Sequence, residues 1–330
     1  MLAAAAVGVL AVSLPTGATR ARARQASAAA PPRAAASQRA AAPTSARASP
    51  PSPCATLPLS STSYTHVVWI WMENHSYGEV IGSSEAPYIN GLAGACGLAT
   101  NYHNISHPSL PNYIAATSGL GLAQLGPFGS DCKPSPTCST SAPSIFGQLA
   151  SWTAYEESMT SNCLKTNSGD YYVRHNPPPY YSTLTNCSTN DVPYPQLAKD
   201  LKAGTLPAFS FVTPNAVDDM HNGTIAQGDS WLAKNVPVIL NSSAYKTGTL
   251  AVFLTWDEGK GGTATDCATN TTDVGCHVAT IVASASTKAA TKSATLFNHY
   301  GLLATTETLL KLPLLGAAAG ATNMISAFNL

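Results

Sequence analysis

Four stretches of the chain are almost continuously apolar and rich in β-branched and aromatic residues. They run over His66–Met72 (HVVWIWM), Leu206–Thr213 (LPAFSFVT), Thr249–Thr255 (TLAVFLT) and His277–Ser284 (HVATIVAS). A strand with one solvent-exposed face would alternate apolar and polar residues. Continuous apolar runs of this length are instead typical of strands that are buried on both faces. We therefore predict four buried strands at these positions.

Stretches with helical spacing alternate with these strands. We expect helices over Ala86–Cys96, Pro111–Gly119, Ser144–Trp152, Tyr194–Gly204, Asp229–Leu240 and Gly301–Leu312. Pro111 suits the first turn of its helix because its φ is fixed, and Gly119 is a common helix stop. The alternation predicts an α/β fold of three layers, αβα, in which helices cover both faces of a mainly parallel sheet.

The first fifty residues differ from the rest of the chain. They contain six arginines and no acid, and are otherwise mostly Ala, Ser and Pro. The apolar run over residues 2–15 is too short for a comfortable membrane span but suits the core of a signal peptide. We predict a signal peptide over roughly 1–30, a disordered linker over 31–57 and a single folded domain over 58–330, with no stable membrane span; an uncleaved anchor is the alternative.

The charge of the expected domain argues against one class of partner. The formal net charge of the whole chain is zero, but the six N-terminal arginines leave 11 Lys and Arg against 17 Asp and Glu in the remainder. Because an acidic domain repels a phosphate backbone, we expect no nucleic-acid partner.

The chain has eight cysteines, of which the first, Cys54, lies at the end of the expected linker, and none forms a CxxC pair or lies at a metal-type spacing from histidine. Disulfides are therefore favoured over zinc, which indicates export to an oxidising compartment. Sequence order suggests three local pairs and leaves a fourth, although order alone does not fix the connectivity. These pairs are Cys132–Cys138, Cys163–Cys187, Cys267–Cys276 and Cys54–Cys96.

Oxygen-bearing side chains follow two of the expected strands directly. Glu73 and Asn74 come after the first strand, and Asp257 and Glu258 come after the third. Adjacent acids at an apolar strand end repel each other unless a cation lies between them. An all-oxygen set suits a hard divalent ion, so we expect one ion of Ca²⁺, Mg²⁺ or Mn²⁺, while iron and zinc stay open.

Ser109 lies at the expected start of the helix in HPSLPNYIAATSG. Free N–H groups and the positive end of the helix dipole attract a phosphate there, although a serine in this position can equally be an ordinary cap. A nearby metal would lower the pKa of the hydroxyl and make it a nucleophile. The histidines His107, His221, His277 and His299 could supply protons.

The segment over Cys163–Pro195 is long, polar and aromatic. Long structured loops within a domain are more often binding rims or lids than passive connections. Its side chains could line a substrate cleft or pack the loop onto its own domain, and both interpretations stay open. The residues concerned are Tyr171, Tyr172, Arg174, His175, Tyr180 and Tyr181.

Taken together, these motifs resemble the bacterial phosphoesterase family of secreted acid phosphatases and phospholipases C, a branch of the alkaline phosphatase superfamily. The similarity runs from about residue 66 to residue 316. The matching pieces are VVWIWMENHSYGEVIG, APYINGLA, HPSLPNYIAATSG, PNAVDDMHNG, FLTWDEG, HVATIVAS and FNHYGLLATTETLLKLPLLG. The resemblance implies an alkaline-phosphatase-like fold and a phosphoesterase domain.

The resemblance also implies roles for particular residues. It implies a metal site made by Glu73, Asn74, Ser109, Asp257 and Glu258. It selects Ser109 over Ser106 as the nucleophile. Asp219, His221 and His299 match positions near the phosphate and the leaving group, and Asn112 either binds a phosphate oxygen or caps its helix. Asn222 replaces the aspartate expected in DMHDG, and the roles of His107 and His277 are not assigned.

The activity implied is that of a secreted, metal-dependent acid phosphatase that hydrolyses phosphate monoesters, phosphoinositides among them, through a phosphoserine. A phospholipase C that cleaves phospholipid diesters is the alternative, and a non-catalytic secreted binding protein on the same fold is the alternative of another class. The expected ligand is a small phosphorylated substrate or a phospholipid headgroup. The oligomeric state is not predicted.

Overall fold

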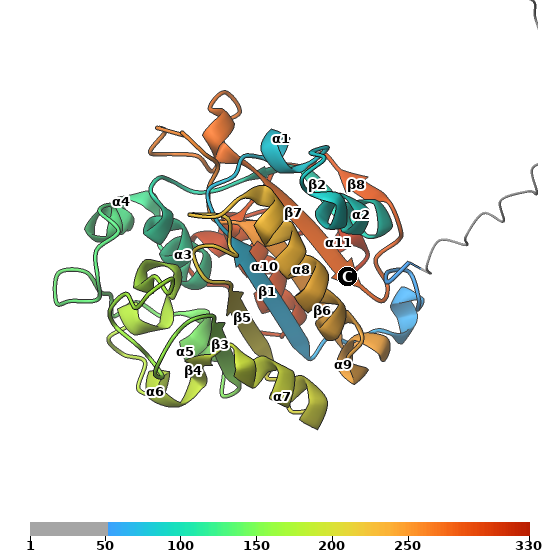
Figure 1. Cartoon of the computed structure of the whole chain (residues 1–330), viewed down its shortest axis with the longest axis horizontal. Helices are drawn as coiled ribbons and strands as arrows, with labels where there is room; N and C mark the ends of the chain where they lie inside the picture. Colours follow the sequence, from blue (N-terminus) through green and yellow to red (C-terminus); the bar gives the residue numbers. More distant parts are fainter. Residues whose placement is uncertain (1–51) are drawn as a thin grey trace, which may run out of the picture. The chain divides into compact units, whose positions relative to one another are not determined.

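A nine-stranded sheet organises residues 52–330, the part of the chain that the computed structural model describes (Figure 1). The strand order is β4-β3-β5-β1-β6-β7-β2-β8, and β9 pairs with β2. The strands are β1 (His66–Met72), β2 (Gly97–His103), β3 (Trp152–Glu156), β4 (Asp191–Pro193), β5 (Phe209–Thr213), β6 (Leu250–Trp256), β7 (His277–Ser284), β8 (Thr291–Ser293) and β9 (Phe297–Asn298).

The sheet is mainly parallel, as predicted. Strands β4, β3, β5, β1 and β6 run parallel, and only β7 runs antiparallel to its neighbours β6 and β2. Two central strands, β1 and β6, are buried almost throughout, which explains their unbroken apolar sequences. All four expected strands are present, with β5 and β6 displaced by one to three residues from the predicted bounds.

Helices lie on both faces of the sheet. The longer ones are α2 (Pro87–Ala95), α3 (Ser109–Ser118), α7 (Pro195–Ala203), α8 (Ile225–Leu240) and α10 (His299–Leu309), and the short ones are α1 (Tyr77–Val80), α4 (Leu122–Leu125), α5 (Ile145–Gln148), α6 (Cys187–Asn190), α9 (Ser243–Lys246) and α11 (Ile325–Phe328). Figure 1 shows α8 in front of the sheet and α10 behind it. The expected αβα layering is confirmed.

Side chains of β1 fix the position of the helices on one face. The Trp69 Nε1–H donates to Thr306 Oγ1 of α10 at 2.9 Å, and the Trp71 ring lies 4.9 Å from that of Tyr113 in α3. Because successive strand residues point to opposite faces, these odd-numbered residues place α3 and α10 on the same side. The carboxyl end of β1 therefore lies beside the start of α3.

One predicted helix was wrong, and β2, β3, β4, β8 and β9 were not among the predicted strands. Over 144–152 only α5 is helical, and Trp152 begins β3, where its ring packs 4.8 Å from Phe146. Burial of that aromatic pair on the sheet outweighs the helical spacing of the sequence. Strand β2 was not expected, because Thr100 and Asn101 interrupt its apolar pattern and are only partly buried.

Several helices begin at a different residue from the one predicted. Helix α8 starts four residues early because Thr224 and Gln227 form a capping box before it. Helix α10 starts at His299, with Asn298 accepting from the Gly301 N–H. Helix α3 starts at Ser109 and not at Pro111, so the serine occupies its first turn.

All four suggested disulfides are present: Cys54–Cys96, Cys132–Cys138, Cys163–Cys187 and Cys267–Cys276. Cys54 is buried, so the ordered fold includes the end of the segment expected to be a linker. The expected signal peptide and most of that linker lie outside the described residues. Within residues 52–330 no helix is long and apolar enough to cross a membrane.

Candidate active site

The acidic residues predicted from the sequence meet at the carboxyl ends of β1 and β6. These two strands are parallel neighbours, so Glu73 after β1 and Asp257 after β6 emerge at the same edge of the sheet. The Asn74 backbone N–H donates to Asp257 Oδ1 at 3.1 Å and joins the two strand ends. Asn74 adopts a positive φ of 51°, which asparagine tolerates better than most residues.

Ser109 lies within this group. It is 2 % exposed, and its Oγ donates to Glu73 Oε2 at 3.0 Å. The Asn74 Nδ2 lies 3.4 Å from the same Oγ. Helix α3 ends as predicted at Gly119, which adopts the left-handed conformation with φ 69°. The hydroxyl therefore stands at the amino end of a well-defined helix and against a carboxylate.

Without a cation, the mutual repulsion and the burial of these carboxylates raise the free energy of the folded state. Burial and the charges of Asp257 and Asp219 raise the pKa of Glu73 well above its usual range. Burial and the charge of Glu258 raise the pKa of Asp257 to about 8. Asp257 is fully buried, and its Oδ2 has no hydrogen-bond partner. An orphaned carboxylate oxygen among further oxygen donors fits a bound divalent ion.

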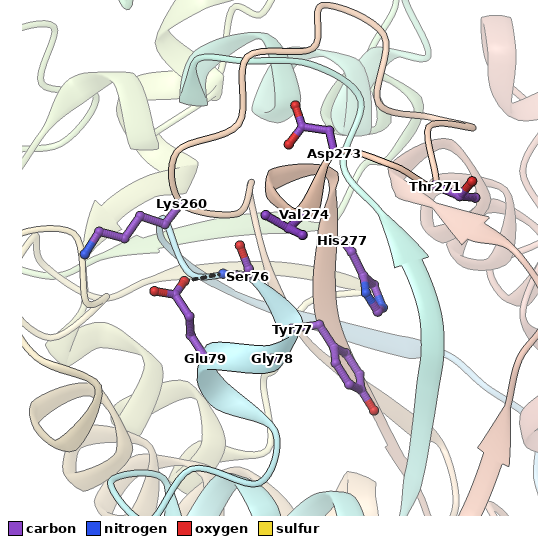
Figure 2. A pocket seen from close by; sticks show the side chains of 9 residues that line it. All are labelled: Ser76, Tyr77, Gly78, Glu79, Lys260, Thr271, Asp273, Val274 and His277. Atoms are coloured by element: carbon purple, nitrogen blue, oxygen red, sulfur yellow. Dashed lines mark hydrogen bonds between the residues drawn. The ribbon is translucent and has the colours of Figure 1, made fainter.

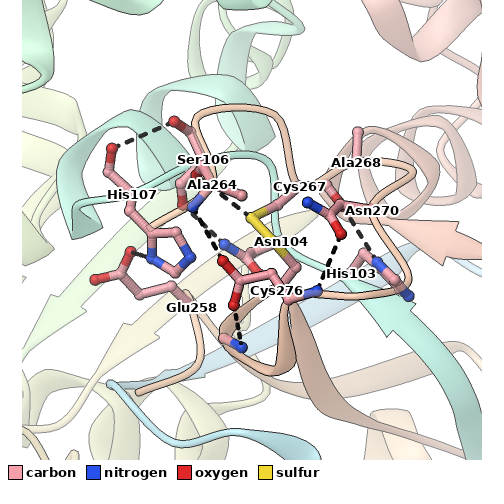
Figure 3. Close-up of a disulfide and its surroundings, with 12 residues drawn as sticks. His103, Asn104, Ser106, His107, Glu258, Ala264, Cys267, Ala268, Asn270 and Cys276 are labelled. Atoms are coloured by element: carbon pink, nitrogen blue, oxygen red, sulfur yellow. Dashed lines mark hydrogen bonds and ion pairs between the residues drawn. A yellow bond between two sulfur atoms is a disulfide. The ribbon is translucent and has the colours of Figure 1, made fainter. Parts of the chain in front are cut away.

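The carboxylate of Glu258 contacts the ring of a histidine, His107. His107 Nδ1 lies 2.5 Å from Glu258 Oε2 (Figure 3). Burial and the charge of Asp131 raise the pKa of Glu258 to about 8. The Cys267–Cys276 disulfide closes the loop beside this pair, as Figure 3 also shows. His107, whose role the sequence left open, thus orients an expected metal ligand.

A second group of polar side chains surrounds the other oxygen of Glu73. Tyr113 OH donates to Glu73 Oε1, and His175 Nε2 lies 3.3 Å from it. His175 Nδ1 is 3.1 Å from Asp219 Oδ2, and Asp219 Oδ1 accepts from the His221 N–H at 2.7 Å. One ligand atom each of Glu73, His175 and His221 lies within 4.8 Å of the others. This mixed nitrogen and oxygen set would suit a softer ion than the all-oxygen set.

His299, which the resemblance matched to a position near the phosphate and the leaving group, is buried and has a partner at each ring nitrogen. Its Nε2 lies 2.7 Å from the Asp257 carbonyl oxygen and its Nδ1 lies 3.0 Å from Tyr102 OH. A carbonyl only accepts, so Nε2 carries the hydrogen and Nδ1 accepts from the tyrosine. Burial lowers the pKa of His299 to about 4 and keeps the ring neutral. His299 therefore holds the backbone of Asp257 in place.

His221 is the expected proton donor that reaches the rim of the site. It is half-buried, and its Nε2 accepts from Arg174 at 2.9 Å while its Nδ1 lies 2.9 Å from Asn222 Oδ1. Burial lowers the pKa of His221, and the contact with Asn222 opposes this shift. Asn222, which replaces the expected aspartate, thus orients this imidazole ring.

Asn112 has no free hydrogen-bonding group for a phosphate. Its Oδ1 accepts from the N–H groups of Ile105 and Ser106 at 2.9 and 3.0 Å. Its Nδ2 donates to the carbonyls of Ser106 and Pro108 at 2.8 and 3.2 Å. The geometry does not support the phosphate-binding role, because the side chain is occupied in shaping the segment that leads to Ser109.

His277 lies outside the carboxyl cluster. Its Nε2 is 3.1 Å from the Thr100 carbonyl oxygen, and its ring stacks on Tyr77 with centroids 4.5 Å apart. Both rings line a pocket of about 590 Å³ with Lys260 and Val274 (Figure 2). The pocket is formed by the loops that follow β1 and β6, next to the strand ends that carry the acids.

The long loop over 163–195 fulfils both interpretations left open by the sequence. Tyr171, Tyr180 and Tyr181 are buried and pack the loop onto the domain. Arg174 and His175 reach into the site instead. Tyr172 lies at the rim, where its ring is 4.4 Å from the Arg174 guanidinium.

Two residues of the site were not identified from the sequence. Tyr113 is one helical turn after Ser109, and that spacing on one face could have shown it. Asp131 accepts from the Leu110 N–H at 2.9 Å and lies in a loop with no periodic pattern. No signal in the sequence connects Asp131 with the site.

Comparisons with known proteins identify the family of this chain. Residues 82–313 match the family model described as "Phosphoesterase family". A phosphatidylinositol-3-phosphatase of Mycobacterium tuberculosis is 30% identical over 264 residues, which are 78% of this chain and 81% of that protein. A phosphate-repressible acid phosphatase of Penicillium chrysogenum is 31% identical over 228 residues, 65% of this chain, and the match spans only 52% of that longer protein.

Solved structures show the same fold at low sequence identity. Murine ectonucleotide pyrophosphatase / phosphodiesterase 5 superposes with a TM-score of 0.55 at 11% identity, over 78% of this chain and 99% of that one. A protein in the alkaline phosphatase superfamily from Vibrio parahaemolyticus superposes with a TM-score of 0.53 at 12% identity, over 78% of this chain and 68% of that one, so the expected alkaline-phosphatase-like fold is confirmed. The family match over 82–313 covers well over half of the sequence. The chain therefore belongs to the Phosphoesterase family and is a phosphoric ester hydrolase.

Proposed function

We propose that the chain is a secreted, metal-dependent acid phosphatase that hydrolyses phosphate monoesters through a phosphoserine on Ser109. The observation that carries the proposal is the position of this buried hydroxyl, at the first residue of α3 and 3.0 Å from a carboxylate oxygen of Glu73. The names of the relatives, a phosphatidylinositol-3-phosphatase and an acid phosphatase, support monoesters as substrates, and the first name is our reason for proposing phosphoinositides among them.

The carboxylate of Glu73 is positioned to take the proton of the attacking hydroxyl. Tyr113 OH and Asn74 Nδ2 both donate to Glu73, so its two oxygens are fixed while Ser109 attacks phosphorus in line. The N–H groups at the start of α3 point toward the negative charge on the phosphoryl oxygens. Hydrolysis of the phosphoserine by water then frees Ser109 for another cycle.

We assign the protonation of the leaving alkoxide to His221, whose Nε2 must give up its bond from Arg174 to carry that proton. It stands at the rim of the site, where Asp219 fixes its backbone and Asn222 its ring. A pKa lowered by burial makes the imidazolium a stronger acid, which favours transfer of its proton at acidic pH. In the second step the same ring can take a proton from the attacking water.

The oxygen donors of Glu73, Asn74, Ser109, Asp257 and Glu258 are the proposed ligands of one divalent ion. When bound, such an ion supplies a Lewis acid and lowers the pKa of the serine hydroxyl. The orphaned Asp257 Oδ2 supports this assignment. Calcium, magnesium and manganese are favoured, and the nearby histidines keep iron and zinc open.

Export of the protein is part of the proposal. Four disulfides among the described residues fit an oxidising compartment, and residues 1–30 are proposed as the signal peptide that directs the chain there. Fractionation of cells that express the full chain tests this, and recovery of the protein in the cytosol alone would contradict it.

The activity is tested with the purified protein, loaded with each divalent ion in turn, on p-nitrophenyl phosphate, bis-p-nitrophenyl phosphate and phosphatidylcholine at acidic and neutral pH. We expect monoester hydrolysis that a chelator abolishes and a divalent ion restores. Robust cleavage of the diester or of the lipid without the monoester would identify a phospholipase C instead.

A matched pair of variants assigns the nucleophile. Ser109→Ala is expected to abolish turnover, whereas Ser106→Ala, which loses only the weak 3.2–3.3 Å contacts of its hydroxyl to two carbonyls, is expected to keep it. Turnover that survives Ser109→Ala would reject the proposed nucleophile. If no substrate is turned over under any condition, a non-catalytic binding protein becomes the better description.

A further inference from the structure

A carboxylate already lies where an anion would bind beside Ser109. Asp131 Oδ1 accepts from the Leu110 N–H at 2.9 Å, and Leu110 directly follows the proposed nucleophile. This N–H belongs to the first turn of α3, where unpaired amides favour negative charge. Asp131 thus makes a contact that a phosphoryl oxygen attached to Ser109 would also seek.

The second oxygen of the same carboxylate faces the positive charge of the site. Asp131 Oδ2 lies 3.6 Å from Arg174 Nε. Arg174 is the only arginine after residue 47, and its guanidinium also donates to His221 and lies over the Tyr172 ring. The residue best suited to grip a phosphate is therefore already paired with an acid of the protein itself.

Asp131 also adds negative charge to a site that must receive an anion. This charge repels an incoming phosphate for as long as the carboxylate stays in place. The carboxylate side chain is about a quarter exposed, which leaves room for it to turn into solvent. A neutral acceptor would satisfy the Leu110 N–H equally well without this repulsion.

We propose that Asp131 is an internal anion that occupies the place of a phosphate oxygen between the Leu110 N–H and Arg174, and that phosphate displaces it on binding. This rests on the proposed function, since it takes Ser109 as the residue that phosphate approaches. The displaced carboxylate weakens the binding of every phosphate, the product included, so inorganic phosphate leaves the site readily. Arg174 pairs with Asp131 in the free protein and with phosphate in the complex, so its guanidinium has an anionic partner in both states.

The test is the affinity for inorganic phosphate of the metal-replete protein, measured by calorimetry and by competition against p-nitrophenyl phosphate. Asp131→Ala frees both partners, and Asp131→Asn keeps an acceptor for the amide but removes the charge. We expect phosphate to bind about tenfold more tightly, or better, in the alanine variant, with the asparagine variant between it and the native protein. Glu85→Gln, which removes an exposed carboxylate in the loop before α2, is expected to change nothing.

Native or weaker phosphate affinity in both Asp131 variants, with an unfolding midpoint equal to that of the native protein, would overturn the proposal. Asp131 would then serve to orient Arg174. If the alanine variant unfolds early, the asparagine variant decides, since it keeps the cap on α3. The gain should also shrink when Arg174→Gln is combined with Asp131→Ala, because the freed guanidinium is its main source.

The same experiment in a Ser109→Ala background separates this proposal from the proposed function. Phosphate affinity does not require turnover, so the gain from Asp131→Ala should persist in the inactive double variant. Turnover that survives Ser109→Ala would reject the nucleophile, whereas an absent gain in phosphate affinity would reject the internal anion.

Discussion

Replacing Asn112 by alanine removes the side chain that holds the segment before Ser109 in shape. Its four hydrogen bonds, at 2.8 to 3.2 Å, all go to backbone groups of residues 105–108. The Ser106 carbonyl keeps a second donor in Asn104 Nδ2 at 2.8 Å. The Ile105 N–H, the Ser106 N–H and the Pro108 carbonyl are left without that partner.

The size of the effect follows from these three groups. A buried polar group left without a partner costs about 1–3 kcal/mol, so Asn112→Ala is expected to lower the free energy of unfolding by about 3 kcal/mol or more. Asn112→Asp keeps the oxygen that accepts both N–H groups but turns a second oxygen toward the Ser106 and Pro108 carbonyls, so it is expected to lose at least as much. Because the segment carries His107 and leads to Ser109, kcat should fall as well.

The assay is denaturant-induced unfolding combined with steady-state kinetics on p-nitrophenyl phosphate. Asn241→Ala is the control, since this exposed amide makes one bond to a carbonyl of its own helix and its loss should change stability by less than about 0.5 kcal/mol. If Asn112→Ala unfolds like the native protein but raises KM about tenfold at unchanged kcat, Asn112 binds phosphate and our interpretation is refuted.

Three further predictions concern proton transfer, pH and the loop disulfide. His221→Asn should lower kcat about 100-fold for an alkyl phosphate and far less for p-nitrophenyl phosphate, because only the alkoxide must be protonated as it leaves; equal losses would contradict a general acid. Burial raises the pKa of Glu307 from 4.5 to about 7. The stability that its neutral carboxyl contributes is therefore fully present below about pH 4.5 and is lost as the pH rises through 7. Glu307→Gln should remove about 1–3 kcal/mol of this decline from unfolding curves, and an unaltered pH profile would show that the carboxyl is not responsible. Serine at both Cys267 and Cys276 should cost about 2–3 kcal/mol and lower kcat by loosening the loop beside Glu258; unchanged kinetics would show that the loop does not position that residue.

The central sheet and the acidic cluster could be predicted because both depend on residues that lie close together in the sequence. Glu73 and Asp257 each follow a buried strand directly, and parallel neighbours bring their carboxyl ends together. Helix α3 was also visible: it ends at Gly119 as predicted and starts two residues before the predicted Pro111. Local patterns of this kind predict the structure well because the same short run of residues forms the element and determines where it ends.

Contacts between distant segments could not be predicted. Asp131 reaches Leu110 only because the loop before Cys132 turns back onto α3, and no pattern in the sequence records that path. The hydrogen bonds that Asn112 and His299 make in the folded chain are likewise not visible in the sequence. Backbone groups of residues 105–108 engage the side chain of Asn112, and the His299 ring lies between the Asp257 carbonyl and the Tyr102 hydroxyl.

The most direct test of the account is to catch the phosphoserine. The metal-replete protein is mixed with a phosphate monoester, quenched with acid within one turnover, digested and sequenced by mass spectrometry. We predict one phosphate on Ser109, formed and lost at the rate of turnover and absent from Ser109→Ala. Turnover with no phosphorylated residue, or with the phosphate on another residue, would contradict the proposed mechanism.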